Sequence, residues 1–246
     1  MALIEELNSQ GNWLFKRRSF LPMLLFIPGI ALFVYQKMES PIANSDNCDL
    51  MYLGVGILGL LIRSFTVGFT PKGTSGRNTT EGQVAEELNT TGIYSTVRHP
   101  LYLGNLLMWL SPILIINNHW FTIVFLLTYW IYYERIMFAE EFFIRNKFGK
   151  AYDDWAENTP PFFPRLKNYT KSTLTFSFRN VLKREYNGFF NLVMIFIIFK
   201  VIEGYVVTEG FHLAFLWKII FAVTAVVFIV LRTLKKTTKI LEVEGR

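Results

Sequence analysis

The chain has 246 residues, of which 52% are hydrophobic and 17% aromatic, and its mean hydropathy is +0.31. This composition is too apolar for an ordinary soluble domain and indicates repeated membrane spans. The formal net charge of +6 raises the alternative of a nucleic-acid-binding protein. The basic residues, however, stand at the ends of hydrophobic segments, which is a signal of membrane topology. We therefore expect no nucleic-acid partner.

Hydrophobic segments recur along the chain and predict an all-α, polytopic membrane bundle with about six transmembrane helices. A short helix on the membrane surface is expected over 1–15, and a second over 178–186. The fourth span is expected to continue as a helix to about Phe148, where Gly149 ends it. In chain order the expected spans are, approximately, 20–35, 50–69, 101–116, 120–138, 189–207 and 211–231.

The distribution of Lys and Arg predicts the orientation of these spans. In the short loops the basic residues gather on one side, in the regions 16–18, 72–98, 145–184 and 232–239. The positive-inside rule then places both termini in the cytosol. Three regions are expected: 1–90, two spans and a cytosolic linker; 91–170, a span hairpin with a cytosolic segment; and 171–246, an interfacial helix and a two-span extension.

Two patterns inside the spans admit a structural explanation. Gly54-x-Gly56-x-x-Gly59 matches a dinucleotide-binding fingerprint as a string, but it lies inside an apolar run with no strand before it. Small residues that allow close helix packing in lipid explain it better. In the fifth span, Lys200 and Glu203 are three residues apart, and we expect them to form a mutual ion pair.

A polar, turn-rich stretch precedes the third span and changes into a hydrophobic helix. Pro100 is predicted as the first helical residue, which places His99 at the cap and Arg98 just outside it. His99 and Tyr102 can share the first helical turn, and Gly104 leaves a gap in the side-chain wall. The positively polarised helix N-terminus beside Arg98 predicts a site for a carboxylate or phosphate.

A second group of polar and aromatic residues follows the fourth span. Glu140 and Glu141 lie on the helix that extends this span, so their carboxylates are expected just beyond the lipid and beside Arg98. Tyr152, Trp155 and Phe163 belong to an aromatic segment that prolines make stiff, and such a segment offers flat faces for stacking.

Together the two stretches resemble the signatures of a known family. Arg98-His99-Pro100-x-Tyr102-x-Gly104 resembles the first signature of the isoprenylcysteine carboxyl methyltransferase and phospholipid methyltransferase superfamily of membrane enzymes. The second signature is similar to Glu140-Glu141, Phe148-Gly149-x-x-Tyr152-x-x-Trp155 and Pro160-Pro161-Phe162-Phe163-Pro164. The resemblance covers about 91–165 and makes 91–170 the expected catalytic core.

The resemblance implies S-adenosylmethionine as methyl donor. Independently of it, the positive-inside rule places both stretches, and so the expected active site, on the cytosolic side. The helix start and Arg98 can take the donor's carboxylate, and Glu140 or Glu141 can accept from its ribose hydroxyls or amino group. The aromatic segment can cover the adenine. The expected cofactor-binding residues are Arg98, His99, Pro100, Tyr102, Gly104, Glu140, Glu141, Tyr152, Trp155 and Phe163.

The family also implies a membrane-embedded acceptor, a lipid or a lipidated substrate, whose identity the sequence leaves open. A carboxylate or phosphate acceptor needs only a cation to position it, and Arg135 and Arg63 are the candidates. An amine acceptor would need a base, for which Glu141 is the candidate. Arg63 lies inside the second span, where it is either functional or reaches to the interface. No metal ligand is expected.

Two other classes of protein remain as alternatives. A sterol-type membrane reductase that uses NADPH has a similar Arg-His-Pro-x-Tyr-x-Gly helix, although Glu140-Glu141 would repel the ribose phosphate of NADPH. A non-catalytic membrane scaffold explains the spans and leaves the two spaced signatures unexplained.

Overall fold

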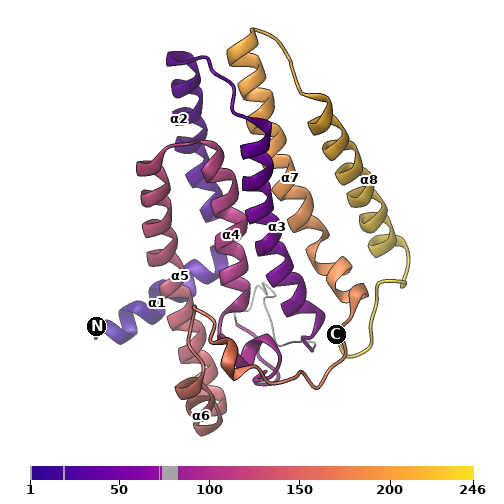
Figure 1. The fold of residues 1–246 in the computed structure, drawn as a ribbon. Coiled ribbons are helices and arrows are strands. Elements are labelled where there is room, and N and C mark those ends of the chain that lie inside the picture. Colours follow the sequence, from indigo (N-terminus) through magenta and orange to yellow (C-terminus); the bar gives the residue numbers. More distant parts are fainter. Residues whose placement is uncertain (1, 19, 72, 74–82) are drawn as a thin grey trace.

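The computed structural model describes residues 2–18, 20–71, 73 and 83–246, and these form an all-α bundle as predicted (Figure 1). Part of the expected cytosolic linker, residues 72 and 74–82, lies outside the described ranges. The α-helices are α1 Leu3–Arg17, α2 Phe26–Glu39, α3 Asp46–Gly68, α4 Pro100–Ile115, α5 His119–Phe148, α6 Lys150–Asn158, α7 Phe178–Thr208 and α8 Phe215–Thr237. Short 3-10 helices occupy η1 Leu21–Leu25, η2 Ile93–Ser95 and η3 Leu166–Asn168.

Four helical segments in the described part of the chain are long and apolar enough to cross a membrane: Leu21–Glu39, α3, α7 and α8. The protein is therefore an integral membrane protein. The 16-residue α4 is a shorter apolar helix, and the 30-residue α5 returns beside it as the predicted hairpin. Asn117 makes the turn with φ of 54°, and the Asn118 side chain caps α5 by accepting from the Phe121 amide at 2.9 Å. A count of six spans stays a prediction.

Helix α3 lies at the centre of the bundle and packs against α4 and α7, while α7 also contacts α2 and α8. Gly59 faces α4 so closely that a Cβ atom there would lie 2.5 Å from the Gly104 carbonyl oxygen. Gly56 is similarly confined by Leu192 and Ser111. The packing explanation of the glycine pattern is thus confirmed at these two positions, whereas Gly54 faces open space.

Helix α7 is longer than the sequence suggested. We expected an interfacial helix over 178–186 and a separate span over 189–207, but one continuous helix runs from Phe178 to Thr208. A lone glycine such as Gly188 weakens a helix without ending it. In addition, the buried Glu185 pairs with Arg63 on α3, which keeps the polar stretch in the bundle. That expectation was therefore wrong.

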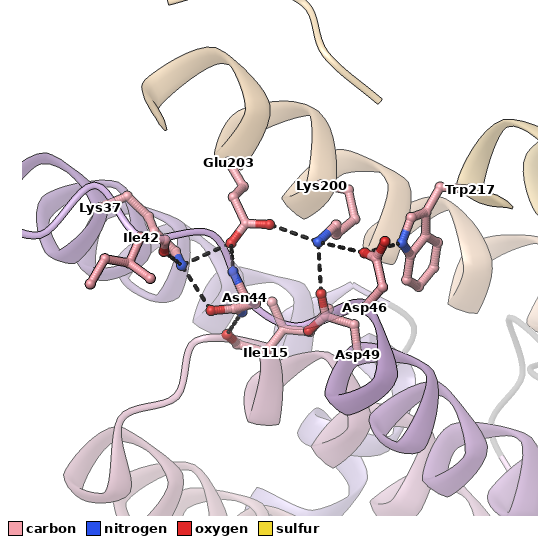
Figure 2. Close-up of polar contacts among 9 residues, drawn as sticks. All are labelled: Lys37, Ile42, Asn44, Asp46, Asp49, Ile115, Lys200, Glu203 and Trp217. Atoms are coloured by element: carbon pink, nitrogen blue, oxygen red, sulfur yellow. Dashed lines mark hydrogen bonds and ion pairs between the residues drawn. The ribbon is translucent and has the colours of Figure 1, made fainter. Parts of the chain in front are cut away.

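The ion pair predicted inside the fifth span is confirmed and belongs to a larger network (Figure 2). The Lys200 ammonium lies 2.7 Å from Glu203, 2.9 Å from Asp49 and 3.1 Å from Asp46. Glu203 also pairs with Lys37 of α2 at 2.8 Å. The network joins α2, α3 and α7 at the end of the bundle remote from α6 (Figure 1).

Both termini, α6 and the projecting part of α5 lie at the other end of the bundle (Figure 1). Helix α1 crosses this end and packs on α5. The first signature, at the start of α4, and the second, which runs from α5 through α6, both lie at this end.

Candidate active site

A cavity opens where the start of α4 meets the projecting part of α5. Its volume is about 880 Å³ when the part open to solvent is counted. One wall is the segment 83–89, and the end of α1 and helix α6 complete the enclosure. Residues from both sequence signatures line the cavity, namely Arg98, His99, Pro100, Tyr102, Glu140, Glu141, Phe148, Tyr152 and Trp155.

The start of α4 has the predicted geometry. His99 is the cap residue and Pro100 the first helical residue. The backbone amides of Arg98 and His99 donate to the carbonyl oxygens of Pro160 and Pro161, at 2.9 and 3.1 Å. The proline-rich part of the second signature therefore holds the first signature in place through the backbone. The side chains of Arg98 and His99 are left free to point to α5.

Three side chains converge on the Glu141 carboxylate. Nε2 of His99 lies 2.8 Å from Oε1 of Glu141. Oε2 accepts from Nη1 of Arg98 at 2.9 Å and from the Tyr152 hydroxyl at 2.7 Å. Arg98 also donates to the Tyr152 hydroxyl at 3.1 Å. This set, called here the Glu141 cluster, joins α4, α5 and α6.

The charges of the cluster reinforce one another. Burial disfavours the charged form of His99, but the neighbouring Glu140 and Glu141 outweigh burial and raise its pKa above the usual 6.5. Burial would raise the pKa of Glu141, yet contacts with His99 and Arg98 lower it below the usual 4.5. Burial and the charge of Glu141 raise the pKa of Tyr152, so its hydroxyl stays a hydrogen-bond donor.

Glu140 lies next to the Glu141 cluster, and its ion pairs are longer than those of Glu141. Oε1 of Glu140 is 3.5 Å from Nη1 of Arg18, and Oε2 is 3.6 Å from Nδ1 of His99. The same Arg18 nitrogen donates to the Tyr102 hydroxyl at 3.3 Å. The Tyr102 ring stacks on His99, with ring centroids 5.6 Å apart and an interplanar angle of 16°.

Two of the three aromatic candidates reach the cavity. Trp155 lines it and anchors its indole nitrogen on the Tyr94 carbonyl oxygen at 3.0 Å, and Tyr152 belongs to the Glu141 cluster. Phe163 is 72% exposed and stands outside the cavity walls. Its neighbour Phe162 is buried instead, against Trp130 of α5 at 5.5 Å between ring centroids.

The structure does not bring Arg63, Arg135 and Gly104 to the cavity. Nε and Nη2 of Arg63 each donate to Glu185 at 2.8 Å, and Nη1 donates to Asn105 at 2.6 Å. Gly104 makes room for this arginine, because a Cβ atom there would lie 2.6 Å from Cγ of Arg63.

Arg135 lies on the face of α5 that α1 covers. Its Nε donates to the Gln10 side chain at 2.9 Å. The arginine proposed to position the acceptor therefore contacts the N-terminal helix. The two helices approach closely at Gly11, because a Cβ atom there would clash with the Arg135 carbonyl oxygen.

Sequence reasoning missed several residues around the site. Phe15 and Tyr94 line the cavity, and Arg18 contacts two of its walls. Arg18 carried only a topology signal, as one of three consecutive basic residues. Glu185 lies 122 residues from Arg63 and had no local pattern to connect the two.

The fold and the site define a class of protein: an integral membrane helical bundle with a cavity at one end that is lined by charged and aromatic residues. Residues 49–151 match the model of the phospholipid methyltransferase family. Through this match and the relatives described next, the chain is similar to the superfamily of isoprenylcysteine carboxyl methyltransferases and phospholipid methyltransferases. The matched segment begins in α3 and ends in α6, so it contains most of the cavity wall.

The chain is similar to several curated proteins. One is a probable protein-S-isoprenylcysteine O-methyltransferase of Oryza sativa subsp. indica, 30% identical over 45% of this chain and 58% of the relative. Another is a protein-S-isoprenylcysteine O-methyltransferase of Schizosaccharomyces pombe, 30% identical over 32% of this chain and 34% of the relative. A third is a nickel-cobalt-cadmium resistance protein of Alcaligenes xylosoxydans xylosoxydans, 32% identical over 46% of this chain and 50% of the relative.

The chain thus spans 58% of the rice relative's length and a smaller share of the other two. No solved structure gave a significant match. Among the described residues, no group of three or more His, Cys, Asp or Glu side chains is placed to hold a metal ion.

Proposed function

We propose that the protein is an integral membrane methyltransferase that uses S-adenosylmethionine and acts on a lipid or lipidated acceptor at the cytosolic face. The proposal rests mainly on the Glu141 cluster, in which residues of both sequence signatures meet in the wall of the cavity. Two relatives named as isoprenylcysteine O-methyltransferases support a methyl-transfer reaction.

The cavity wall contains a hydrogen-bond donor that could bind a polar ligand. Nε of Arg98 is buried and has no hydrogen-bond partner among the described residues. Buried donors are normally satisfied, so this atom favours a ligand with an acceptor, such as the donor's carboxylate. The aromatic faces of Trp155 and Tyr94 are suited to an adenine.

The two adjacent carboxylates have different tasks in this proposal. Both oxygens of Glu141 are occupied by His99, Arg98 and Tyr152, so Glu141 orders the wall. The ion pairs of Glu140 are long, at 3.5 and 3.6 Å, so its oxygens keep lone pairs for ligand hydroxyls or an amino group. Glu140 is therefore the proposed ligand-accepting carboxylate.

When bound, S-adenosylmethionine supplies an electrophilic methyl group. The task of the chain is then to hold the donor and acceptor in line and to exclude water, since proximity and orientation provide most of the rate. A carboxylate or phosphate acceptor fits this site better than an amine. Glu141, with its lowered pKa and occupied oxygens, is a poor general base.

Donor binding tests the proposal directly. Detergent-purified protein is titrated with S-adenosylmethionine, S-adenosylhomocysteine and NADPH by calorimetry. We expect the first two to bind and NADPH to fail, because Glu140 and Glu141 repel the NADPH phosphate. Arg98→Gln should weaken binding at least tenfold, and Arg179→Gln, an exposed arginine on α7, serves as control. Binding of NADPH alone would favour the reductase, and binding of neither cofactor would favour the scaffold.

A further inference from the structure

The N-terminal helix α1 is docked on α5 through specific contacts. Gly11 allows the helices to touch, because a Cβ atom there would clash with the Arg135 carbonyl oxygen and with Cβ of Ala139. Gln10 accepts from Arg135 at 2.9 Å. In this position the end of α1 lies at the cavity. Helix α1 lies outside the segment that matches the family model.

Arg18, directly after α1, is a nearly buried cation between two cavity walls. Its guanidinium lies 3.8 Å from the centre of the Phe15 ring, and Phe15 itself lines the cavity. Its Nη1 reaches the Tyr102 hydroxyl at 3.3 Å and Oε1 of Glu140 at 3.5 Å. The Arg18 side chain is only 11% exposed, so these contacts are shielded from water.

The position of Arg18 matters because it is the guanidinium that faces Glu140, whose other polar neighbours are the Tyr102 hydroxyl and His99. His99, at 3.6 Å, is already committed to Glu141. A carboxylate in this setting keeps its orientation only if a cation opposes its charge. Stacking on Phe15 holds the planar guanidinium in one place, which a flexible ammonium would not achieve equally well.

We propose that Arg18 is a positioning residue, which orients Glu140 and Tyr102 for the methyl donor and so makes α1 part of the active site. The inference rests on the proposed function, because it assigns Glu140 to the donor. Arg18 acts through Glu140 and has no direct contact with the reacting atoms.

The test compares two neighbouring arginines in the full-length purified protein. Arg17 is the matched control, since its guanidinium stacks on Trp13 within α1, 4.1 Å from the ring centre. We expect Arg18→Gln to raise the Kd for S-adenosylmethionine about tenfold, the effect of losing roughly one charged hydrogen bond. Arg17→Gln should change it less than about twofold. Arg18→Lys should fall between the wild type and Arg18→Gln.

A cycle with Glu140→Gln separates positioning from a general structural role. If Arg18 acts through Glu140, Arg18→Gln will add little to the Kd of the Glu140→Gln variant. Fully additive effects, or equal Kd values for Arg17→Gln and Arg18→Gln, would overturn the inference. So would a Kd that rises only in proportion to the unfolded fraction in thermal melts. Failure of the wild type to bind the donor would instead overturn the proposed function.

Discussion

Arg98 and Glu141 lie 43 residues apart in the sequence and meet at 2.9 Å in the wall of the cavity. Arg98 precedes α4 and Glu141 lies beyond the apolar part of α5, so the contact closes the open end of the hairpin. Each residue comes from a different family signature. The spacing of the two signatures is therefore explained by the need to bring this pair together.

Replacement of the two adjacent glutamates should separate stability from ligand binding. Glu141→Gln removes a charge that accepts from His99, Arg98 and Tyr152, so we expect a loss of about 2–3 kcal/mol in unfolding free energy as well as weak donor binding. Glu140→Gln should lower donor affinity at nearly unchanged stability. Thermal unfolding and calorimetry on both variants measure this, and equal destabilisation by the two would contradict the division of tasks.

The pH dependence of stability should report the His99–Glu141 contact. The pKa of His99 is raised, so its stabilising charge is fully present below about pH 6.5 and is lost as the pH rises through the higher folded-state pKa. The pKa of Glu141 is lowered, so its contribution is present above about pH 4.5 and is lost as the pH falls through the lower value. The pair therefore stabilises the fold most between these limits.

We accordingly expect the difference in Tm between the wild type and His99→Gln to be larger at pH 6 than at pH 9. His119→Gln provides the control, because His119 is exposed at the opposite end of α5. A difference that is constant with pH, or larger at pH 9, would show that His99 does not stabilise the fold as a cation.

Two oppositely oriented ion pairs set the register of α3 against α7. Asp49 of α3 pairs with Lys200 of α7, and Arg63 of α3 pairs with Glu185 of α7. The separations are nearly equal, 63 − 49 = 14 residues on α3 and 200 − 185 = 15 on α7, which is about 21 and 22 Å of helix. The spacing of the charged residues on α3 thus equals that on α7 to within one residue, so both ion pairs can form at the same time.

Removal of one partner from the Arg63–Glu185 pair should lower the free energy of unfolding. Glu185→Gln leaves Arg63 without its counter-charge in an apolar setting, and we expect a loss of about 3 kcal/mol. The double variant Arg63→Met with Glu185→Leu should recover most of that loss, because it leaves no buried charge. Unfolding in detergent measures both. A double variant less stable than Glu185→Gln alone would indicate that Arg63 has a further role.

Gly104 belongs to the first signature, yet the structure assigns it to helix packing. Gly104→Ala places a methyl group against Cγ of Arg63 and the Gly59 carbonyl oxygen, so we expect a destabilisation of about 1–3 kcal/mol. The donor affinity of the folded fraction should stay the same. Calorimetry on protein that gel filtration shows to be folded would test this, and a selective loss of affinity would restore Gly104 to the cofactor site.

Local signals in the sequence predicted several helix ends and one turn of the fold. Pro100 marked the start of α4, Asn117 and Asn118 marked the hairpin turn, and Gly149 marked the end of α5. Each of these depends on backbone preferences of a single residue or its neighbours. The same holds for the contact between Lys200 and Glu203, which are one helical turn apart.

Contacts between residues on distant elements could not be predicted from local sequence signals. Glu185 and Arg63 are joined by the packing of α7 on α3, and Arg18 reaches Glu140 only because α1 docks on α5. The exposed position of Phe163 and the burial of Phe162 depend on which way one loop turns against α5. None of these relationships has a periodicity that a sequence pattern can reveal.

The most direct test of the central claim is methyl transfer itself. Membranes that contain the wild type, Arg98→Gln or Arg179→Gln are incubated with methyl-labelled S-adenosylmethionine, and labelled lipids and peptides are identified by mass spectrometry. We predict label in a lipid or lipidated acceptor for the wild type and Arg179→Gln, and its near-complete loss for Arg98→Gln. Equal labelling by all three, or no labelling above membranes that lack the protein, would contradict the account.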